Sequence, residues 1–182
     1  NNEDLRLEVG QLRRILQALR RLYKISAQIT SETDVFQLLD RILELALTTI
    51  RARDGSLLLV DDESEELAFV VVHGSVRDKL SGFRIPIGEG IAGWVAQEGE
   101  PVIIHDVYLD HRFSTRIDQS LNFITRSMVC VPIIWQGKVR GVIQGLNKEE
   151  GEEFVQSDLT LLGVVSQLAA SAIGKAEETI SE

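Results

Sequence analysis

One cysteine and three histidines are the residues from which nucleophilic or metal chemistry would first be built in this chain. Cys130 lies inside the apolar run 129–132, where a cysteine usually behaves as a small buried hydrophobic residue. A single cysteine excludes an intrachain disulfide and a multi-cysteine zinc site. His73, His105 and His111 are interpreted as surface or hydrogen-bonded residues, so no metal site is predicted.

The carboxylates gather in two runs, at residues 61–66 and 149–153. Both runs are typical of solvated turns and do not resemble a separated pair of catalytic acid and base. Ser, His and Asp residues are present, but no nucleophile-elbow or phosphate-loop motif accompanies them. The chain is therefore predicted not to be an enzyme.

Composition narrows the class of protein further. The chain has 182 residues, of which 44% are hydrophobic and 26% charged, as expected for one globular domain. Its net charge of −9 argues against nucleic acid as a partner, because basic side chains supply most of that affinity. No membrane contact and no signal peptide are predicted. One cysteine favours a reducing, cytoplasmic location, and the missing initial methionine suggests a piece of a longer polypeptide.

The first 30 residues carry a heptad pattern. Apolar residues recur along one seam between basic residues, which predicts an amphipathic helix able to form a coiled coil. We expect residues 1–30 to be a signalling helix that supports a homodimer; packing on its own domain is the alternative. The seam residues are Leu5, Leu12, Ile15, Leu19, Leu22 and Ile29.

Residues 31–176 are predicted to form an α+β domain with an antiparallel sheet, and 177–182 to start a linker helix. A helix over about 35–50 is expected to end at Asp54-Gly55, and the last helix covers about 154–180. A short helix is expected over 91–97, and the polar connection 108–126 has the length of a binding segment or lid. Strands are predicted over 56–60, 67–73, 83–87, 102–104, 128–135 and 138–146.

Glycines mark two places where backbone or ligand could approach closely. Gly88, Gly90 and Gly93 permit a tight turn from strand to helix, and the N–H groups at the helix start could bind an anion or a carbonyl oxygen. A turn that simply needs glycines is the alternative. Gly141 and Gly145 leave one face of a strand bare, for close packing of a helix or for a ligand.

The glycine turn belongs to an ordered set of motifs. Residues 85–96 read IPIGEGIAGWVA, and the pattern continues in register through 99–107 and 110–113. Residues 127–133 and 141–148 follow, and then Phe154 with Asp158-Leu159. Together these segments, spanning roughly residues 33–176, resemble the GAF domain family.

This resemblance implies a six-stranded antiparallel sheet whose first and last helices share one face and often pair across a dimer. Short helices and loops would cover the other face, with a small ligand beneath them. The implied function is a sensory domain that relays ligand binding through its flanking helices to a fused effector. The alternative is a ligand-free dimerisation module, with the pocket filled by Phe69, Phe113, Phe123 and Met128.

Two ligand classes of this family can be compared with the sequence. Members that bind cyclic nucleotides have a motif that Asn147, Lys148, Phe154 and Asp158 match, with Leu159 where the family has Glu. The resemblance implies that Lys148 and Asp158 form a structural ion pair. Cyclic nucleotide is thus a candidate ligand, and a phosphate could be met by Arg112, Arg116 or Arg126. A covalently attached bilin needs a thiol in the lid, where this chain has none, so no covalent chromophore is expected.

The pocket implied by the resemblance is assigned by position. Two residues follow the glycine turn, two begin the lid, four belong to the lid, and two lie on the next strand, where alternation places them on one face without deciding which. These predicted pocket residues are Ile91, Ala92, Asp106, Val107, Phe113, Ile117, Phe123, Thr125, Ser127 and Val129.

Overall fold

The computed structural model describes residues 32–75, 80 and 82–180, together with scattered positions between 2 and 17. The predicted coiled coil of residues 1–30 lies largely outside the described residues and stays a prediction. At positions that are described there, Leu5, Leu7 and Val9 are exposed.

A single antiparallel sheet of six strands organises the domain, which confirms the predicted α+β class. Its spatial order is β3-β2-β1-β6-β5-β4, and every neighbouring pair is antiparallel. The strands are β1 (Ala52–Asp61), β2 (Glu66–His73), β3 (Arg84–Pro86), β4 (Val102–Ile104), β5 (Met128–Trp135) and β6 (Lys138–Lys148).

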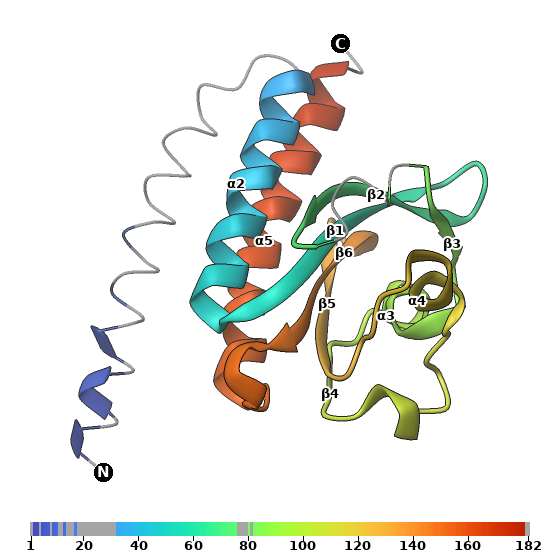
Figure 1. The fold of residues 1–182 in the computed structure, drawn as a ribbon. Helices are drawn as coiled ribbons and strands as arrows, with labels where there is room; N and C mark the ends of the chain where they lie inside the picture. Colours follow the sequence, from blue (N-terminus) through green and yellow to red (C-terminus); the bar gives the residue numbers. More distant parts are fainter. Residues whose placement is uncertain are drawn as a thin grey trace.

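Two long helices, α2 (Glu32–Ile50) and α5 (Gln156–Ile180), lie side by side across one face of the sheet (Figure 1). Their apolar residues recur at helical spacing, so each helix presents one stripe to the core. The largest side chains in this layer are fully buried, including Leu39, Ile42, Ile143, Phe154 and Leu162. Burial of this layer is the main stabilisation that the two helices receive.

The junction between α2 and β1 differs from the prediction. Asp54-Gly55 do not end the helix, because Arg51 does so with a positive φ of 56°, and β1 begins at Ala52. Gly55 is needed inside the strand, since a Cβ there would overlap the Leu47 side chain of α2. The glycine therefore allows close approach of helix and sheet and does not mark a turn.

The opposite face of the sheet carries shorter elements (Figure 1). These are α3 (Gly90–Glu98), the 3₁₀ turn η2 (Val107–Leu109) and α4 (Arg116–Leu121), so the connection 108–126 is partly helical. A second buried cluster lies beneath α3, with Leu58 and Val142 from the sheet meeting Ile91 and Val95.

The hairpin of β5 and β6 explains two sequence features. Gln136 and Gly137 both have positive φ, 50° and 77°, as a two-residue hairpin turn requires. Pro132 lies beyond Cys130, where the pairing of β5 with β4 ends, so its missing N–H leaves no neighbouring strand unpaired.

The face of β6 that Gly141 and Gly145 leave without side chains is closely packed. A Cβ at Gly145 would lie 3.0 Å from Cδ1 of Ile50 and 3.3 Å from Val129. At Gly141 it would overlap the Leu58 carbonyl oxygen. Gly141 therefore allows close approach of the β1 backbone, and Gly145 allows close packing of the helix layer. Neither glycine provides room for a ligand.

Helix α5 is long and apolar enough over Gln156–Glu178 to cross a membrane by length and composition alone. In this fold, 44% of that window is buried, and its apolar stripe packs against α2 and β5. Burial in a core of this kind accounts for the hydropathy of the helix.

Candidate ligand cavity

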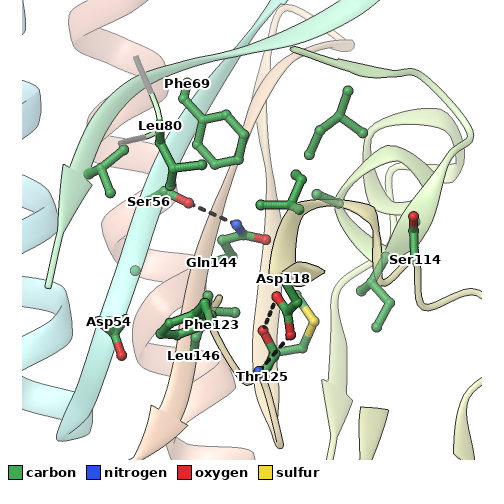
Figure 2. Close-up of a pocket in the computed structure, with 18 of the residues that line it drawn as sticks. Asp54, Ser56, Phe69, Leu80, Ser114, Asp118, Phe123, Thr125, Gln144 and Leu146 are labelled. Carbon is green, nitrogen blue, oxygen red and sulfur yellow. Dashed lines mark hydrogen bonds between the residues drawn. The ribbon is translucent and has the colours of Figure 1, made fainter. Parts of the chain in front are cut away.

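A cavity of about 90 Å³ lies between the sheet and the α3–α4 layer, and we call it the inner cavity (Figure 2). Its wall is mainly apolar, with a few polar side chains from β1, β6 and the lid. The apolar lining comes from Phe69, Val72, Leu80, Ile85, Ile91, Ala92, Phe113, Ile117, Phe123, Met128 and Leu146.

The sheet side of the inner cavity carries a buried polar pair. Gln144 of β6 donates from Nε2 to Oγ of Ser56 on β1 at 2.8 Å, as Figure 2 shows. The strand register places these two residues directly opposite each other. Gln144 is 7% exposed and Ser56 2%. This bond uses one of the two amide hydrogens and leaves the amide oxygen unused.

The lid side is ordered by Asp118 of α4. Its carboxylate accepts a hydrogen bond from the backbone N–H of Thr125 at 2.7 Å and another from Thr125 Oγ1 at 2.9 Å. Asn122 ends α4 in the left-handed conformation, with φ 52°. This chain reversal brings Phe123 against the cavity and returns the chain to β5.

Arg116 attaches α4 to β3 and to Glu89, the residue before α3. Its guanidinium donates to the Arg84 carbonyl at 3.0 Å and to Oε1 of Glu89 at 3.3 Å. The two charged side chains are 48% and 39% exposed. An exposed pair of this kind contributes little stability, so the lid is weakly attached on this side.

The start of α3 has the predicted glycine turn. Gly88 and Gly90 both have positive φ, and the first intrahelical bond runs from Gly93 N–H to the Glu89 carbonyl. The first residues of a helix have N–H groups without intrahelical partners. Ile91 and Ala92 occupy these positions and line the inner cavity.

Six of the ten predicted pocket residues line the inner cavity. They come from α3 and the lid, the segments that the resemblance placed over the sheet. They are Ile91, Ala92, Phe113, Ile117, Phe123 and Thr125.

The other four predicted residues lie elsewhere. Val129 is fully buried on the helix side of β5, and Ser127 lines a separate groove at the end of the sheet. Alternate residues of β5 face opposite sides of the sheet. Met128 therefore faces the lid and lines the inner cavity, whereas Val129 faces the helices. Val107 is buried in the cluster beneath α3, and exposed Asp106 accepts the Tyr108 N–H at the start of η2.

Sequence reasoning missed several lining residues, above all Ser56, Gln144 and Asp118. A polar side chain within the apolar run 142–146 was a signal for Gln144. Its partner Ser56 is 88 positions away and is found only through the strand register.

The ion pair implied by the resemblance has the expected geometry. Nζ of Lys148 lies 2.6 Å from Oδ2 of Asp158, with the side chains 10% and 12% exposed. The same carboxylate accepts the Val155 N–H at 2.9 Å. The pair therefore fastens the end of β6 to the start of α5. Leu159, which replaces the family's Glu, packs against the helix-side core.

Of the arginines considered for a phosphate, Arg112 is already engaged. It forms a two-pronged ion pair with Asp110, at 2.9 and 2.6 Å, and lies 4.3 Å from the centre of the Trp94 ring. The hydrogen-bonded guanidinium lowers the pKa of Asp110 to about 2. This cluster holds the beginning of the lid against α3.

Cys130 is fully buried on β5, as predicted, and burial raises the pKa of its thiol. Among the described residues, no three His, Cys, Asp or Glu side chains gather in a way that could hold a metal ion.

A family model described as GAF domain matches residues 34–173. The chain belongs to the GAF domain family. Membership makes it a sensory or regulatory domain.

Relatives of this GAF domain include two signalling enzymes. It is 33% identical over 159 residues to the dual 3′,5′-cyclic-AMP and -GMP phosphodiesterase 11A of Takifugu rubripes, covering 82% of this chain and 18% of that protein. It is also 33% identical over 151 residues to the dual phosphodiesterase 11 of Drosophila melanogaster, covering 75% and 10%. The chain thus spans less than a fifth of these relatives.

Solved structures share the fold. The GAF domain of a phosphoenolpyruvate-protein phosphotransferase from Coxiella burnetii has a TM-score of 0.78 at 21% identity, covering 92% of this chain and 97% of that one. A free methionine-R-sulfoxide reductase from Neisseria meningitidis has a TM-score of 0.71 at 21% identity, covering 90% of each. The fold is thus shared with a domain of a phosphotransferase and with a free methionine-R-sulfoxide reductase.

Proposed function

We propose that this GAF domain is ligand-responsive and that its ligand binds in the inner cavity. The observation that carries the proposal is the buried Ser56–Gln144 pair on an otherwise apolar wall, under a lid ordered by Asp118. Buried polar groups are costly unless they are hydrogen-bonded. An apolar pocket with a few polar groups that retain bonding capacity is typical of small-molecule sites.

Cyclic nucleotides are the ligand class to test first. The two phosphodiesterases named above act on cyclic AMP and cyclic GMP, and each is 33% identical to this chain. The Gln144 amide offers a donor and an acceptor to a base edge. The helix N-terminus at Ile91 and Ala92 offers backbone N–H groups to a phosphate.

The size of the cavity adds a requirement. About 90 Å³ is well below the roughly 300–1,000 Å³ of ordinary ligand pockets. A nucleotide therefore needs α4 to move outward. The exposed Arg116–Glu89 pair on one side of α4 makes this movement inexpensive.

Calorimetry of the full chain with cyclic GMP and cyclic AMP tests the ligand, with 5′-GMP and 5′-AMP as comparisons. A ligand at 100 times its Kd should stabilise the fold by about 2.7 kcal/mol. Gln144→Leu should weaken binding about tenfold or more, because it removes a buried hydrogen-bonding group. The matched variant Gln167→Leu, exposed on α5, should bind like the wild type. Absence of heat and of stabilisation with both cyclic nucleotides would exclude them.

A ligand-free dimerisation module is the second candidate. Phe69, Phe113, Phe123 and Met128 all line the cavity, and the space they leave is small. On this reading the domain holds its long helices in register without a ligand. A domain that dimerises yet shows no stabilisation by any member of a metabolite panel would favour it over the sensor.

We further propose that the chain itself is not catalytic. Methionine-sulfoxide reductases of this fold use several cysteines, whereas this chain has one, fully buried. Neither methionine-R-sulfoxide reduction nor cyclic-nucleotide hydrolysis should be detectable with the purified chain. A fused effector, a homodimer through the terminal helices and a cytoplasmic location stay predictions.

A further inference from the structure

A second hollow lies beside the inner cavity, at the ends of β1 and β6 and the start of β5. We call it the groove; its volume is about 660 Å³ and its lining is mostly polar. Among the residues that the structure describes, Asp54 and Phe123 are the two that line both hollows. The groove and the inner cavity are thus neighbours, and Asp54 and Phe123, which Figure 2 labels at the inner cavity, belong to the walls of both.

One side of this shared wall is fixed. The Asp54 carboxylate is 6% exposed and accepts hydrogen bonds from the N–H of Ser75 at 2.8 Å and from its hydroxyl at 3.1 Å. A Cβ on Gly74 would overlap the same carboxylate, so the backbone is closely packed around it.

The other side of the wall can move. Phe123 lies on the lid between Asn122, in the left-handed conformation, and Ile124, which is 61% exposed. The Phe123 ring is only partly buried and packs against Leu80 in a small cluster separate from the main core. Rotation of this ring is the smallest change that would join the two hollows.

The lining of the groove carries three basic and three acidic side chains, and two of the basic ones are arginines without an ion-pair partner among the described residues. Lys148 is paired with Asp158 and Glu152 with Arg51. Arg53 and Arg126 are exposed, and neither forms an ion pair with a described residue. The acidic residues left in the lining are Asp54, whose carboxylate is occupied by Ser75, and Glu153, which is 75% exposed and lies 3.9 Å from His105.

The backbone of Arg126 is held firmly even though its side chain is exposed. Its N–H donates to Oδ1 of Asn147 at 2.7 Å, and its carbonyl accepts the Val107 N–H at 2.8 Å. Asn147 lies on β6 between Leu146 and Lys148, which pair with Asp54 and Ala52 on either side of Arg53. The two arginines therefore project from fixed positions around one hollow, an arrangement suited to carboxylate or phosphate groups.

We propose that the groove is an entrance site for anionic ligands, held first by Arg53 and Arg126 and admitted to the inner cavity past Phe123. The proposal rests on the proposed function only in taking the inner cavity as the ligand's destination. Two guanidinium groups without ion-pair partners at an entrance should raise the association rate of anionic ligands, an effect that is lost at high salt.

The test measures access to the inner cavity without needing the natural ligand. Ser56→Cys places a thiol on the cavity wall with minimal change of shape. Its rate of labelling is measured in the full chain with an anionic reagent, methanethiosulfonate ethylsulfonate, and a cationic one, methanethiosulfonate ethyltrimethylammonium. The native Cys130 is buried, and the chain without the Ser56 change gives its background.

Phe123 is tested first, by substitution in the Ser56→Cys chain. Phe123→Leu and Phe123→Ala should raise the labelling rates of both reagents by a similar factor of about five or more, because both use the same gate. Phe123→Trp should lower both rates. The smaller Leu change covers the case in which the Ala variant does not fold. Unchanged rates in folded variants would overturn the assignment of Phe123.

The arginines are tested by the ratio of the two rates, in which the thiol's own reactivity cancels. The anionic reagent should be favoured at low salt, and Arg53→Gln with Arg126→Gln should reduce the ratio about fivefold, with little change near 0.5 M salt. The control pair Arg41→Gln and Lys138→Gln removes the same charge outside both hollows and should leave the ratio unchanged. An equal ratio before and after the groove substitutions would overturn the entrance site. Either result is informative even if cyclic nucleotides do not bind.

Discussion

At the scale of single residues, the charge pairs that hold the lid differ in how much they stabilise the fold, because they differ in exposure to solvent. The Arg116–Glu89 pair is about half exposed, and solvent screens it. The Asp110–Arg112 pair is 15% and 20% exposed and two-pronged, and the guanidinium also stacks on Trp94. The lid is therefore fastened at its beginning and loosely attached at α4.

Asp110→Asn tests the fastened end. The pKa of Asp110 is lowered to about 2, so its ion pair stabilises the fold above the unfolded value of about 3.9 and this stabilisation disappears as the pH falls towards 2. The variant should lose about 1–2 kcal/mol at pH 7. Urea unfolding at pH 7 and pH 2 measures the difference, which should be mostly lost at pH 2, where about half of the native Asp110 carboxyl groups are protonated.

The control is Asp62→Asn, in the exposed pair of Asp62 with Lys138. This change should cost under about 0.5 kcal/mol at either pH. A loss for Asp110→Asn that persists at pH 2 would show that the side chain acts through packing and not through its charge.

Lys148 and Asp158 form the least exposed ion pair described, and a mutant cycle tests it. Lys148→Met should cost about 3 kcal/mol, because it leaves a nearly buried carboxylate unpaired. Adding Asp158→Asn removes the stranded charge and keeps an acceptor for the Val155 N–H. Thermal and urea unfolding should show the double variant at least about 1 kcal/mol more stable than Lys148→Met; a double variant that is less stable would contradict an ionic role.

At the scale of elements, the position of α3 depends on the turn that precedes it. Gly88 donates its N–H to the Gly93 carbonyl at 2.9 Å, which folds the end of β3 back onto the first turn of the helix. A Cβ on Gly93 would lie 2.7 Å from the Pro86 carbonyl oxygen and 3.0 Å from the Gly88 nitrogen. Since both are backbone atoms, nothing flexible can yield.

Gly93→Ala should therefore destabilise the domain by about 2 kcal/mol, although alanine is normally the better helix residue by about 1 kcal/mol. The matched change is Gly163→Ala in α5, where a Cβ would meet nothing within 4 Å. That variant should gain about 0.5–1 kcal/mol. Both values come from urea unfolding, and equal effects of the two substitutions would contradict the close approach at Gly93.

At the scale of the whole molecule, the long helices lie on one face of the sheet, and α3 and α4, which cover the cavity, lie on the other (Figure 1). The central strands serve both faces: Ser56 and Gln144 line the cavity, while their neighbours Leu57 and Ile143 pack beneath α2 and α5. A further link runs from β2, where Nε2 of His73 lies 2.8 Å from Asp40 of α2. A change in the cavity thus has a short physical route to the helices.

Removal of residues 1–30 tests the predicted coiled coil. Leu5 and Val9 of the heptad pattern are 58% and 46% exposed, and apolar residues repeated along a helix favour association with a second copy. Sedimentation should show a dimer for the full chain and weaker association, by about tenfold or more in Kd, for residues 31–182. If the full chain is monomeric at the same concentrations, the seam does not join two copies.

Local patterns in the sequence were sufficient for much of the architecture. Helical spacing predicted α2 and α5 and alternation predicted the strands, because each of these depends on neighbours along the chain. The ordered motifs also indicated the family and six of the cavity residues. The predicted end of this helix near residue 50 agrees with α2, but its assignment to Asp54-Gly55 was wrong, since Gly55 allows contact with Leu47 and does not form a turn.

Tertiary structure alone decided which face of a strand meets the cavity. Alternation puts Ser127 and Val129 on one face and Met128 on the other, but only the packing of α2 and α5 assigns the first face to the helices. The pairing of Ser56 with Gln144 follows from the strand register, and the position of Asp54 and Phe123 at both hollows follows from the position of the lid. Contacts between residues far apart in sequence leave no periodic signal, so the chemistry of the cavity became visible only when the sheet was assembled.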